Sequence, residues 1–313
     1  MIIREAYAQG SADLKFAGID TPGLDASLLL AHVLKTTRTA LVAAGTEKLS
    51  EKICKEYCSL IERRCLGECV AYLTGKKEFR GLEFHVNHSV LVPRPETETL
   101  VEAAIEIVKS NGENQKDDKQ KPLCDSKLSA GQQYSGVNIL ELCTGSGAVA
   151  ISLKNELPEL EIHATDISKE ALEIARKNAK RLLPGSNLHF YQGDLYSALS
   201  NCSLLIASNR RFAFSLIIAN PPYIPSDEIQ TLSQEVQNEP RLALDGGKSG
   251  LDIITRIIAE APDYLSLGGT LLLEADPRQM LDIAELFKNR GFINIRFFED
   301  LSGKKRVIGG IFE

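Results

Sequence analysis

Four consecutive residues, Asn220, Pro221, Pro222 and Tyr223, have side chains and carbonyls that could hold a planar amine. They follow an apolar run, residues 216–219, that predicts a buried strand, and the prolines end it because they cannot donate to a neighbouring strand. The side-chain carbonyl of Asn220 and the backbone carbonyl of Pro221 can both accept hydrogen bonds from an NH2 group. Such bonds aim the nitrogen at an electrophile while its charge develops, and the Tyr223 ring supplies a flat face. All four residues are therefore candidates for substrate binding, with Asn220, Pro221 and Tyr223 as candidate catalytic residues. A strand ending in a proline-rich turn is the plainer interpretation.

A second candidate site lies where a predicted strand, residues 137–142, leads directly into a predicted helix from residue 148. The turn between them reads Cys143-Thr144-Gly145-Ser146-Gly147. Glycines let the backbone approach a ligand closely, and the start of a helix offers unpaired N–H groups. The dinucleotide fingerprint G-x-G-x-x-G is not met, so this turn is a weak signal by itself.

Two carboxylates follow the next two predicted strands. Asp166 ends a strand about twenty residues after the glycines, where an acid can accept from both hydroxyls of a ribose. Asp194 follows the third strand, where it could accept from an adenine amino group. One ligand that carries adenine and ribose would satisfy the turn and both acids, because the carboxyl ends of parallel strands meet at one edge. The plainer interpretation of Asp166 is a helix cap.

With these motifs together, the chain resembles the S-adenosylmethionine-dependent amino-methyltransferases, which carry Asn-Pro-Pro-Tyr after the fourth strand. Three further stretches resemble one family among them, the release-factor glutamine methyltransferases. These stretches are GECVAYLTGKKEFRGLEFHVNHSVLVPRPETE, NEPRLALDGGKSGLDIITRIIAEAPDYL and DLSGKKRVIGG. The resemblance implies methyl transfer from S-adenosylmethionine to the side-chain amide nitrogen (N5) of a glutamine, with S-adenosylhomocysteine as product. The glutamine is that of the Gly-Gly-Gln loop in class I peptide chain release factors.

The resemblance also implies roles for individual residues. The turn 143–147 matches the loop beside the methionine part of the cofactor, Asp166 matches the ribose acid, and Asn220 to Tyr223 match the clamp for the substrate amide. The implied cofactor-binding residues are Cys143, Thr144, Gly145, Ser146, Gly147, Asp166, Asp194, Leu195 and Asn220.

Four departures from the family pattern stand out. Cys143 replaces a common glycine, and Leu195 replaces an aromatic residue that stacks on adenine in some relatives. The stretch LEADPRQ, residues 273–279, departs from the usual Glu-Ile-Gly run, and residues 197–212 are longer than usual. We expect these last two stretches to lie away from the clamp.

The chain is predicted to be an α/β protein with a doubly wound, Rossmann-like methyltransferase sheet. Residues 1–73 predict a small all-α domain, including one helix around Leu24–Leu34 capped by Asp25 and one long helix over Ser50–Tyr72. Residues 74–95 predict a β-hairpin linker with strand-like runs at 78–86 and 89–92, and a helix starts after Pro95. Residues 96–313 predict the methyltransferase domain, with a flexible exposed loop at 110–136.

Alternating elements support the doubly wound prediction. Strands are expected at 137–142, 161–165, 188–192, 214–219 and 269–274, with helices at 148–155 and 169–182.

Seven cysteines raise the question of a metal site. Four of them, Cys54, Cys58, Cys65 and Cys69, would share one face of the long helix. Cys54 and Cys69 would lie about 22 Å apart along its axis, too far to share one ion. We therefore expect small core residues and no metal.

The charge and composition bear on partners and location. The net charge of −6 comes without a basic stripe, so we expect no stable nucleic-acid binding. No signal peptide or membrane-spanning run is visible, which predicts a cytoplasmic protein without membrane contact, and we expect a monomer.

Two alternatives stay open: an N6-adenine methyltransferase acting on DNA or RNA, whose amine the clamp would suit equally well, and a non-catalytic module that only binds the adenosine ligand. Selectivity for a release factor would have to come from contacts outside the clamp, and residues 1–73 are the natural docking surface.

Overall fold

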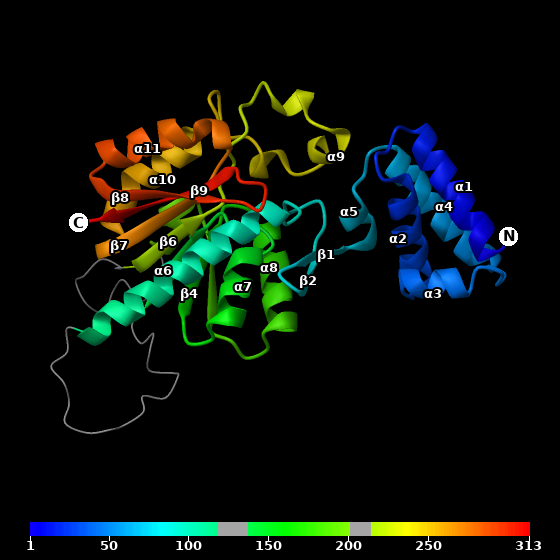
Figure 1. Ribbon diagram of the computed structural model, residues 1–313, viewed down its shortest axis with the longest axis horizontal. Helices are drawn as coiled ribbons and strands as arrows, with labels where there is room; N and C mark the ends of the chain where they lie inside the picture. The colour runs from blue at the N-terminus through cyan, green and yellow to red at the C-terminus, as the bar shows by residue number, and fades with distance from the viewer. Residues whose placement is uncertain (118–136, 201–213) are drawn as a thin grey trace. The chain divides into compact units, whose positions relative to one another are not determined.

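The computed structural model describes residues 1–117, 137–200 and 214–313 of the chain. Within these ranges it forms two compact units (Figure 1). The first, called the helical unit, comprises residues 1–76, 86–88 and 232–239. The second, called the sheet unit, comprises residues 77–85, 89–231 and 240–313. In the described ranges, none of the helices combines the length and apolarity needed to cross a bilayer.

Six helices make up the helical unit, as far as the structure describes it. They are α1 (Ile3–Phe16), α2 (Pro22–Leu34), α3 (Arg38–Ala43), α4 (Glu51–Cys65), α5 (Val70–Thr74) and the short α9 (Gln234–Gln237). Their shared core includes Leu14, Leu29 and Leu30, all fully buried, and the ring of Tyr57. Burial of such side chains is worth about 1.5–3 kcal/mol each, which is why the apolar faces of these helices pack against one another.

The expected helix over Ser50–Tyr72 is wrong, because two helices occupy that stretch. Helix α4 ends at Cys65, and Gly67 has a positive φ of 86° that an α-helix cannot accommodate. Cys69 then precedes α5, so the four cysteines do not share one helical face. Cys58 is exposed and Cys69 is buried, so the expected core role fits Cys69 and fails for Cys58.

Asp25 is not the cap of α2. The residue before that helix is Thr21, and Asp25 lies inside the helix, where it is 4% exposed. Its carboxylate accepts a 2.8 Å hydrogen bond from Nε of Arg64, which is itself buried in α4. A polar residue near a helix start is a common cap, and only the fold shows that this one forms a buried ion pair.

The β-hairpin lies within a shorter stretch than expected. Strands β1 (Lys76–Phe79) and β2 (Leu82–His85) are joined through Arg80 and Gly81, both with positive φ, as a two-residue hairpin turn requires. Residues 89–92 form no strand. A short 3₁₀ turn, η1 (Pro95–Thr97), then leads into α6 (Glu98–Asp117), so the start of the expected loop at 110–136 is helical; residues 118–136 lie outside the described ranges.

A seven-stranded sheet forms the centre of the sheet unit, in the order β5-β4-β3-β6-β7-β9-β8. Its strands are β3 (Asn138–Leu142), β4 (Glu161–Asp166), β5 (Leu188–Gln192), β6 (Phe214–Ala219), β7 (Leu265–Glu274), β8 (Phe292–Glu299) and β9 (Lys305–Phe312). Strands β3 to β7 pair in parallel, and β9 runs antiparallel to both β7 and β8. The doubly wound fold class is confirmed, although the sequence did not predict β8 and β9.

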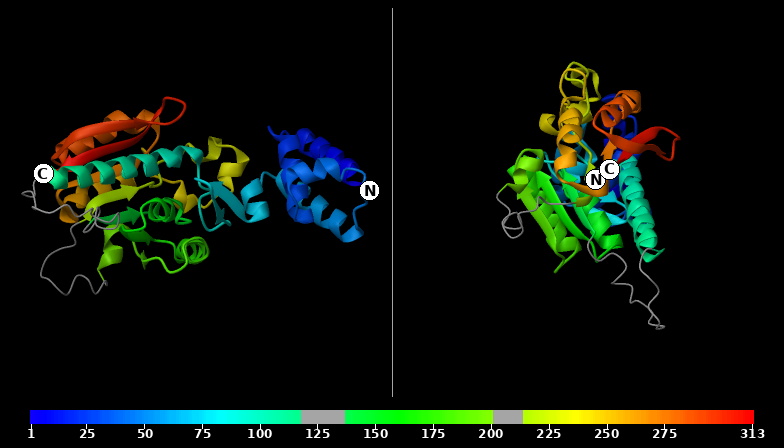
Figure 2. Two further views of the ribbon diagram at one scale, coloured as in Figure 1. Left: turned by 60° about the horizontal axis from the view of Figure 1, so that its bottom comes forward. Right: turned by 90° about the vertical axis from the view of Figure 1, so that its left-hand side faces the viewer.

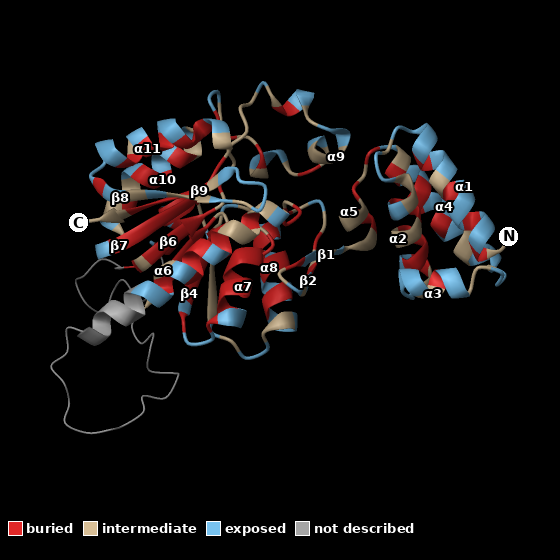
Figure 3. Cartoon of the chain, in the orientation of Figure 1, coloured by how far each residue is buried: buried red, intermediate tan, exposed pale blue. Residues whose placement is uncertain are grey.

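Helices and short 3₁₀ turns connect these strands. They are α7 (Ala148–Glu156), α8 (Lys169–Leu182), η3 (Leu195–Leu199), η5 (Ile229–Thr231), η6 (Arg241–Ala243), α10 (Asp252–Glu260), η7 (Ala261–Asp263), η8 (Pro277–Gln279) and α11 (Met280–Asn289). Helices α6, α7 and α8 pack side by side, and α10 packs on α11 (Figure 2). These two groups cover opposite faces of the sheet (Figure 2), and strands β3, β4 and β6 between them are buried almost throughout (Figure 3). The longer-than-usual segment at 197–212 falls largely outside the described ranges.

The order of the strands reverses between β3 and β6. From β3 the chain proceeds outward through β4 and β5, and β6 lies on the other side of β3. In an open parallel sheet, a crevice forms beyond the carboxyl ends of the strands at such a reversal. The fold therefore predicts a ligand site after Leu142, Asp166 and Ala219.

Candidate active site

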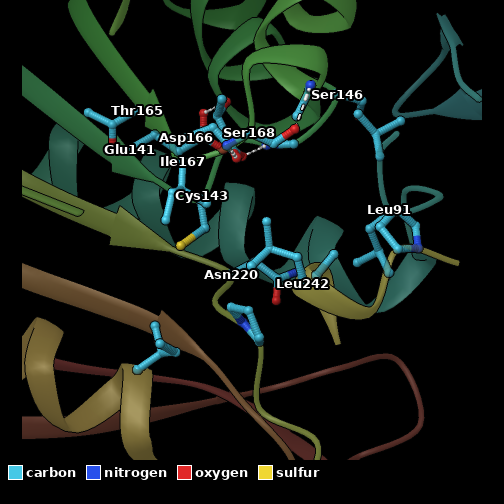
Figure 4. A pocket seen from close by; sticks show the side chains of 18 of the residues that line it. Leu91, Glu141, Cys143, Ser146, Thr165, Asp166, Ile167, Ser168, Asn220 and Leu242 are labelled. Atoms are coloured by element: carbon cyan, nitrogen blue, oxygen red, sulfur yellow. Dashed lines mark hydrogen bonds between the residues drawn. The ribbon is translucent and has the colours of Figure 1, made fainter. Parts of the chain in front are cut away.

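A pocket opens at this edge of the sheet (Figure 4). Cys143, Asp166, Asp194 and Asn220, which follow or end four different strands, all line it. Most residues of the segments 89–94, after the hairpin, and 240–243 contribute further to its wall. The tertiary structure thus gathers into one cavity residues that the sequence places as far apart as Cys143 and Asn220.

The turn after β3 bends sharply into α7. Cys143, Gly145 and Gly147 all have positive φ, of 58°, 54° and 80°. A side chain at Gly147 would lie 2.9 Å from Ile151 and 3.3 Å from Ala175, so glycine also permits close packing there. Cys143 adopts its positive φ despite its side chain, which costs roughly 1–2 kcal/mol and explains why glycine suits this position.

Glu141 supports the turn from inside the sheet. Its Oε2 accepts a 2.6 Å hydrogen bond from the Thr144 hydroxyl and a 3.2 Å bond from the Ala150 N–H. The side chain is 3% exposed, and burial raises its pKa to about 8 against the opposing effect of these two bonds. The sequence analysis missed this residue, and the available signal was an acid in the otherwise apolar run of β3.

Asp166 holds the same turn from the neighbouring strand. Its Oδ2 accepts from the Gly145 N–H at 2.8 Å, and its Oδ1 accepts from the Ser168 N–H at 2.9 Å. Burial raises the pKa of Asp166, while N–H donors, those of Ser168 and Gly145 among them, oppose that rise. The cap of α8 is Ser168, whose hydroxyl accepts from the Ala171 N–H, so Asp166 is not needed as a cap.

Asp194 stands at the rim of the pocket in an ion pair. Arg256 from α10 donates a 2.7 Å bond to Oδ2 of Asp194, and both side chains are about half exposed, at 45% and 46%. Such exposed pairs contribute little stability, so the pair mainly fixes where the carboxylate points. The adjacent Leu195 is 5% exposed and also belongs to the apolar core beneath the pocket.

Asn220 extends from the end of β6 into the pocket. Its Nδ2 donates a 3.1 Å hydrogen bond to the hydroxyl of Thr97, which is 4% exposed at the end of η1. Among the residues described, Pro222 also lines the pocket, whereas Pro221 is buried and Tyr223 packs against the apolar core without lining it.

The backbone after Asn220 is clamped by a second segment. The Ile224 N–H donates to the Leu244 carbonyl at 3.0 Å, and the Gly246 N–H donates to the Ile224 carbonyl at 2.9 Å. A side chain at Gly246 would come within 2.8 Å of the Pro222 carbonyl. Gly246 therefore lets the stretch LALDGG lie directly against the Asn-Pro-Pro-Tyr backbone.

The expectation that LEADPRQ lies away from the clamp is wrong. Gln279, its last residue, donates a 2.9 Å bond from Nε2 to the backbone carbonyl of Tyr223. Glu274, its second residue, forms hydrogen bonds with Thr97 and Asn220 that lower its pKa, against a larger rise from burial. Strands β6 and β7 are neighbours in the sheet, so the end of β7 has to meet the residues that follow β6.

Most of the predicted site residues share the pocket. Those that line it are Cys143, Thr144, Gly145, Ser146, Asp166, Asp194, Leu195, Asn220 and Pro222, whereas Gly147, Pro221 and Tyr223 stand behind it. The sequence analysis missed several further residues that line the cavity or touch the site, namely Arg94, Thr97, Glu141, Arg256, Glu274 and Gln279.

Sequence families match both parts of the chain. Residues 5–75 match the family described as the PrmC N-terminal domain, and residues 126–294 match the methyltransferase small domain. A release factor glutamine methyltransferase from Deinococcus radiodurans is 35% identical over 308 residues, covering 98% of each chain. The chain belongs to the release factor glutamine methyltransferase family.

Another family member agrees over a similar length. The release factor glutamine methyltransferase of Moorella thermoacetica is 34% identical and covers 98% of this chain and 97% of its own. The protein is therefore a methyltransferase, as its sequence motifs predicted.

Solved structures agree at the level of the fold. The 16S rRNA N2 G1207 methyltransferase RsmC of T. thermophilus matches with a TM-score of 0.50 at 16% identity, covering 76% of this chain and 50% of that one. The hMettl16 catalytic domain matches with a TM-score of 0.52 at 12% identity, covering 81% and 82%. At these identities the likeness shows a shared methyltransferase fold and nothing about the substrate.

Proposed function

We propose that this enzyme transfers a methyl group from S-adenosylmethionine to N5 of the glutamine in the Gly-Gly-Gln loop of class I peptide chain release factors. The observation that carries the proposal is the placement of Asn220 in the same pocket as Asp166 and Cys143. An amine holder and a nucleoside site at one cavity are what methyl transfer to nitrogen requires. The nearly full-length relatives named as release factor glutamine methyltransferases support the choice of glutamine.

The pocket suits the chemical parts of S-adenosylmethionine. Each carboxylate oxygen of Asp166 holds one backbone N–H and keeps further acceptor capacity for a ribose hydroxyl. Asp194 supplies an acceptor for the adenine amine. At Gly145 no heavy atom outside its chain neighbours lies within 4 Å of an added side chain, so there is room for a ligand against the turn.

Asn220 and Pro221 would act on the substrate amide. When bound, S-adenosylmethionine supplies an electrophilic methyl group on a sulfonium. The side-chain carbonyl of Asn220, which lines the pocket, would accept one N–H bond of the glutamine amide. We assign the other N–H bond to the backbone carbonyl of Pro221, whose residue stands behind the lining, and the two bonds together would fix the nitrogen in line with that group. Both carbonyl dipoles would stabilise the positive charge that develops on this nitrogen.

Selectivity for a protein substrate needs contacts beyond the clamp, since any exposed glutamine would fit it. We assign this docking role to the helical region, residues 1–73, with the enzyme acting as a cytoplasmic monomer. Whole release factor should then be a much better substrate than a short Gly-Gly-Gln peptide, and deleting residues 1–73 should remove that preference. Residues 232–239 pack in the helical unit, so the cofactor affinity of the truncated enzyme has to be measured as its control.

Labelled methyl donor tests the function directly. The enzyme is incubated with a class I release factor, with the same factor carrying asparagine in place of the loop glutamine, and with duplex DNA. Label on the first factor alone, located on the glutamine side chain by mass spectrometry, is the expected result. Label on DNA would instead support adenine methylation, and cofactor binding without transfer to any substrate would support a non-catalytic module.

A further inference from the structure

Two buried groups contact the Asn220 amide. Thr97, at the end of η1, accepts from Nδ2 of Asn220 at 3.1 Å. Glu274, the last residue of β7, forms hydrogen bonds with both Thr97 and Asn220. Thr97 is 4% exposed and also lines the pocket, whereas Glu274 is 1% exposed and does not line it, so Glu274 lies behind the clamp.

Glu274 is an unusual residue for such a place. One of its oxygens, Oε2, is buried and has no hydrogen-bond partner in the part of the chain that the structure describes. The guanidinium of Arg306 on β9, whose charge opposes the rise in the pKa of Glu274, donates instead to Asp300 at 3.1 Å. A buried carboxylate without an ion-pair partner is costly, so a purely structural role would be served better by an apolar side chain.

A carboxylate here does one thing that an apolar residue cannot. The two ends of an asparagine amide have nearly the same shape, so packing alone does not decide which end faces the pocket. An ionised carboxylate only accepts hydrogen bonds, and therefore it requires the NH2 end of Asn220 on its own side. The Oδ1 end is then directed to the pocket.

We propose that Glu274 and Thr97 are positioning residues that lock the Asn220 amide with Oδ1 facing the substrate nitrogen. The inference rests on the proposed function, in which that oxygen accepts from the glutamine NH2. The charge of Glu274 also polarises the amide to which it is bonded, which strengthens Oδ1 as an acceptor. The unusual LEADPRQ stretch thereby keeps an acid, Glu274, at a position that touches Asn220.

Protonation of Glu274 should weaken this lock. Burial raises the pKa of Glu274 to about 7; Arg306 on β9 opposes that rise and Glu96 on η1 adds to it. Tyr223, which follows β6, also lies near this charge. Burial and the charge of Glu274 both raise the pKa of the Tyr223 hydroxyl above its ordinary value. A protonated Glu274 can donate to Oδ1 of Asn220 and so permits the reversed amide. The turnover number should therefore fall as the pH drops through about 7.

The test compares the full-length enzyme with Glu274→Gln, Thr97→Val and Thr97→Ser. Glutamine and valine keep the shape of the side chain they replace, and serine keeps the hydroxyl. The kcat and KM for whole release factor are measured from pH 6 to pH 9, together with S-adenosylmethionine affinity and thermal stability. We expect Glu274→Gln and Thr97→Val to lower kcat about tenfold at pH 8 with cofactor affinity kept, because a charge-assisted bond is roughly twice as strong as a neutral one. Thr97→Ser should stay near wild type, and Glu274→Gln should lose the acidic limb of the profile.

Several results would overturn the proposal. One such result is that Glu274→Gln leaves kcat and its pH profile unchanged. Another is that Thr97→Ser lowers kcat as much as Thr97→Val does. Lower thermal stability with unchanged kcat per folded enzyme would also overturn it, because that is what a merely structural role predicts. If Glu274→Gln does not fold, the two Thr97 variants decide. If the wild-type enzyme methylates an amine other than the glutamine, the proposed function fails. The rates of the wild type and of the Glu274 and Thr97 variants on that other amine then still test whether Asn220 is locked.

Discussion

The backbone N–H of Gly145 donates a 2.8 Å hydrogen bond to Oδ2 of Asp166, which joins the turn after β3 to the end of β4. One carboxylate thus holds the glycine turn and presents acceptors to the pocket. The proposed cofactor loop and the proposed ribose acid therefore form one structure.

Replacing Asp166 by alanine should weaken cofactor binding. The change removes the acceptor for the ribose and the anchor of Gly145, and loss of such charge-assisted bonds costs about 1.5–3 kcal/mol, roughly a tenfold to hundredfold increase in Kd. Calorimetry with S-adenosylmethionine measures the effect. Glu173→Ala, which removes an exposed acid from the following helix, is the matched control and should leave Kd unchanged. Unchanged affinity in the Asp166 variant would show that the ribose assignment is wrong.

Asn220→Ala should remove most turnover and leave the fold intact. The side chain lines the pocket and supports no apolar core, so its loss should affect the transition state, by about a hundredfold in kcat. Single-turnover methylation of a release factor gives the rate, and thermal unfolding reports the fold. Asn289→Ala, at an exposed position ending α11, serves as the control. Near-normal methylation by the Asn220 variant would refute the proposed clamp.

Glu141 should make the protein less stable as the pH rises. Burial raises the pKa of Glu141 to about 8, so the folded state keeps a proton that the unfolded state releases near pH 4.5. Between these values the unfolded state binds fewer protons, and stability falls with increasing pH. This acid should account for about 2 kcal/mol of lost stability from pH 6 to pH 8.

Urea unfolding of the wild type and of Glu141→Gln at pH 6 and pH 8 measures how much of the stability loss comes from Glu141. Glutamine keeps an acceptor for Thr144 and Ala150 but does not titrate. The stability of the Glu141→Gln variant should therefore fall less than that of the wild type between pH 6 and pH 8. Glu274, whose pKa burial raises to about 7, contributes in the same direction and remains in both proteins. Equal losses in the two proteins would show that Glu141 does not titrate in this range.

The buried pair of Arg64 and Asp25 should dominate the stability of the helical unit. Their side chains are 4% and 6% exposed, and Arg64 also pairs with Glu235 in α9. Arg64→Met leaves a buried carboxylate without its partner, which costs about 3–5 kcal/mol. Hydrogen exchange should show faster exchange in residues 22–34 and also in residues 232–239.

Arg63→Met is the matched control for this effect. The Arg63 side chain is 48% exposed in its pair with Glu68, and exposed pairs contribute about 0–1 kcal/mol. Adding Asp25→Leu to Arg64→Met should restore much of the lost stability, because both charges are then absent. Protection of 232–239 that survives Arg64→Met would show that this segment is held by other contacts.

The sequence by itself determined the elements whose signals are local. Strands β3 to β6 and helices α7 and α8 were predicted almost to the residue, because apolar runs and amphipathic periods are properties of a short window. The same signals located Asp166 and Asn220 at strand ends. From there, the rule that parallel strands share one edge led to the pocket.

Only the tertiary structure decided which side chains support that pocket. Asn220 meets Thr97 across 123 residues, Gln279 meets the Tyr223 backbone across 56, and Arg64 meets Asp25 across 39. Strands β8 and β9 were missed for a related reason, since β9 is defined by its antiparallel pairing with β7 and β8. Strand order and register fix these partners, and neither is written in the composition of any single segment. A local pattern can therefore place Asn220 at the end of a strand, but the side of its amide that faces the pocket depends on residues brought there by the fold.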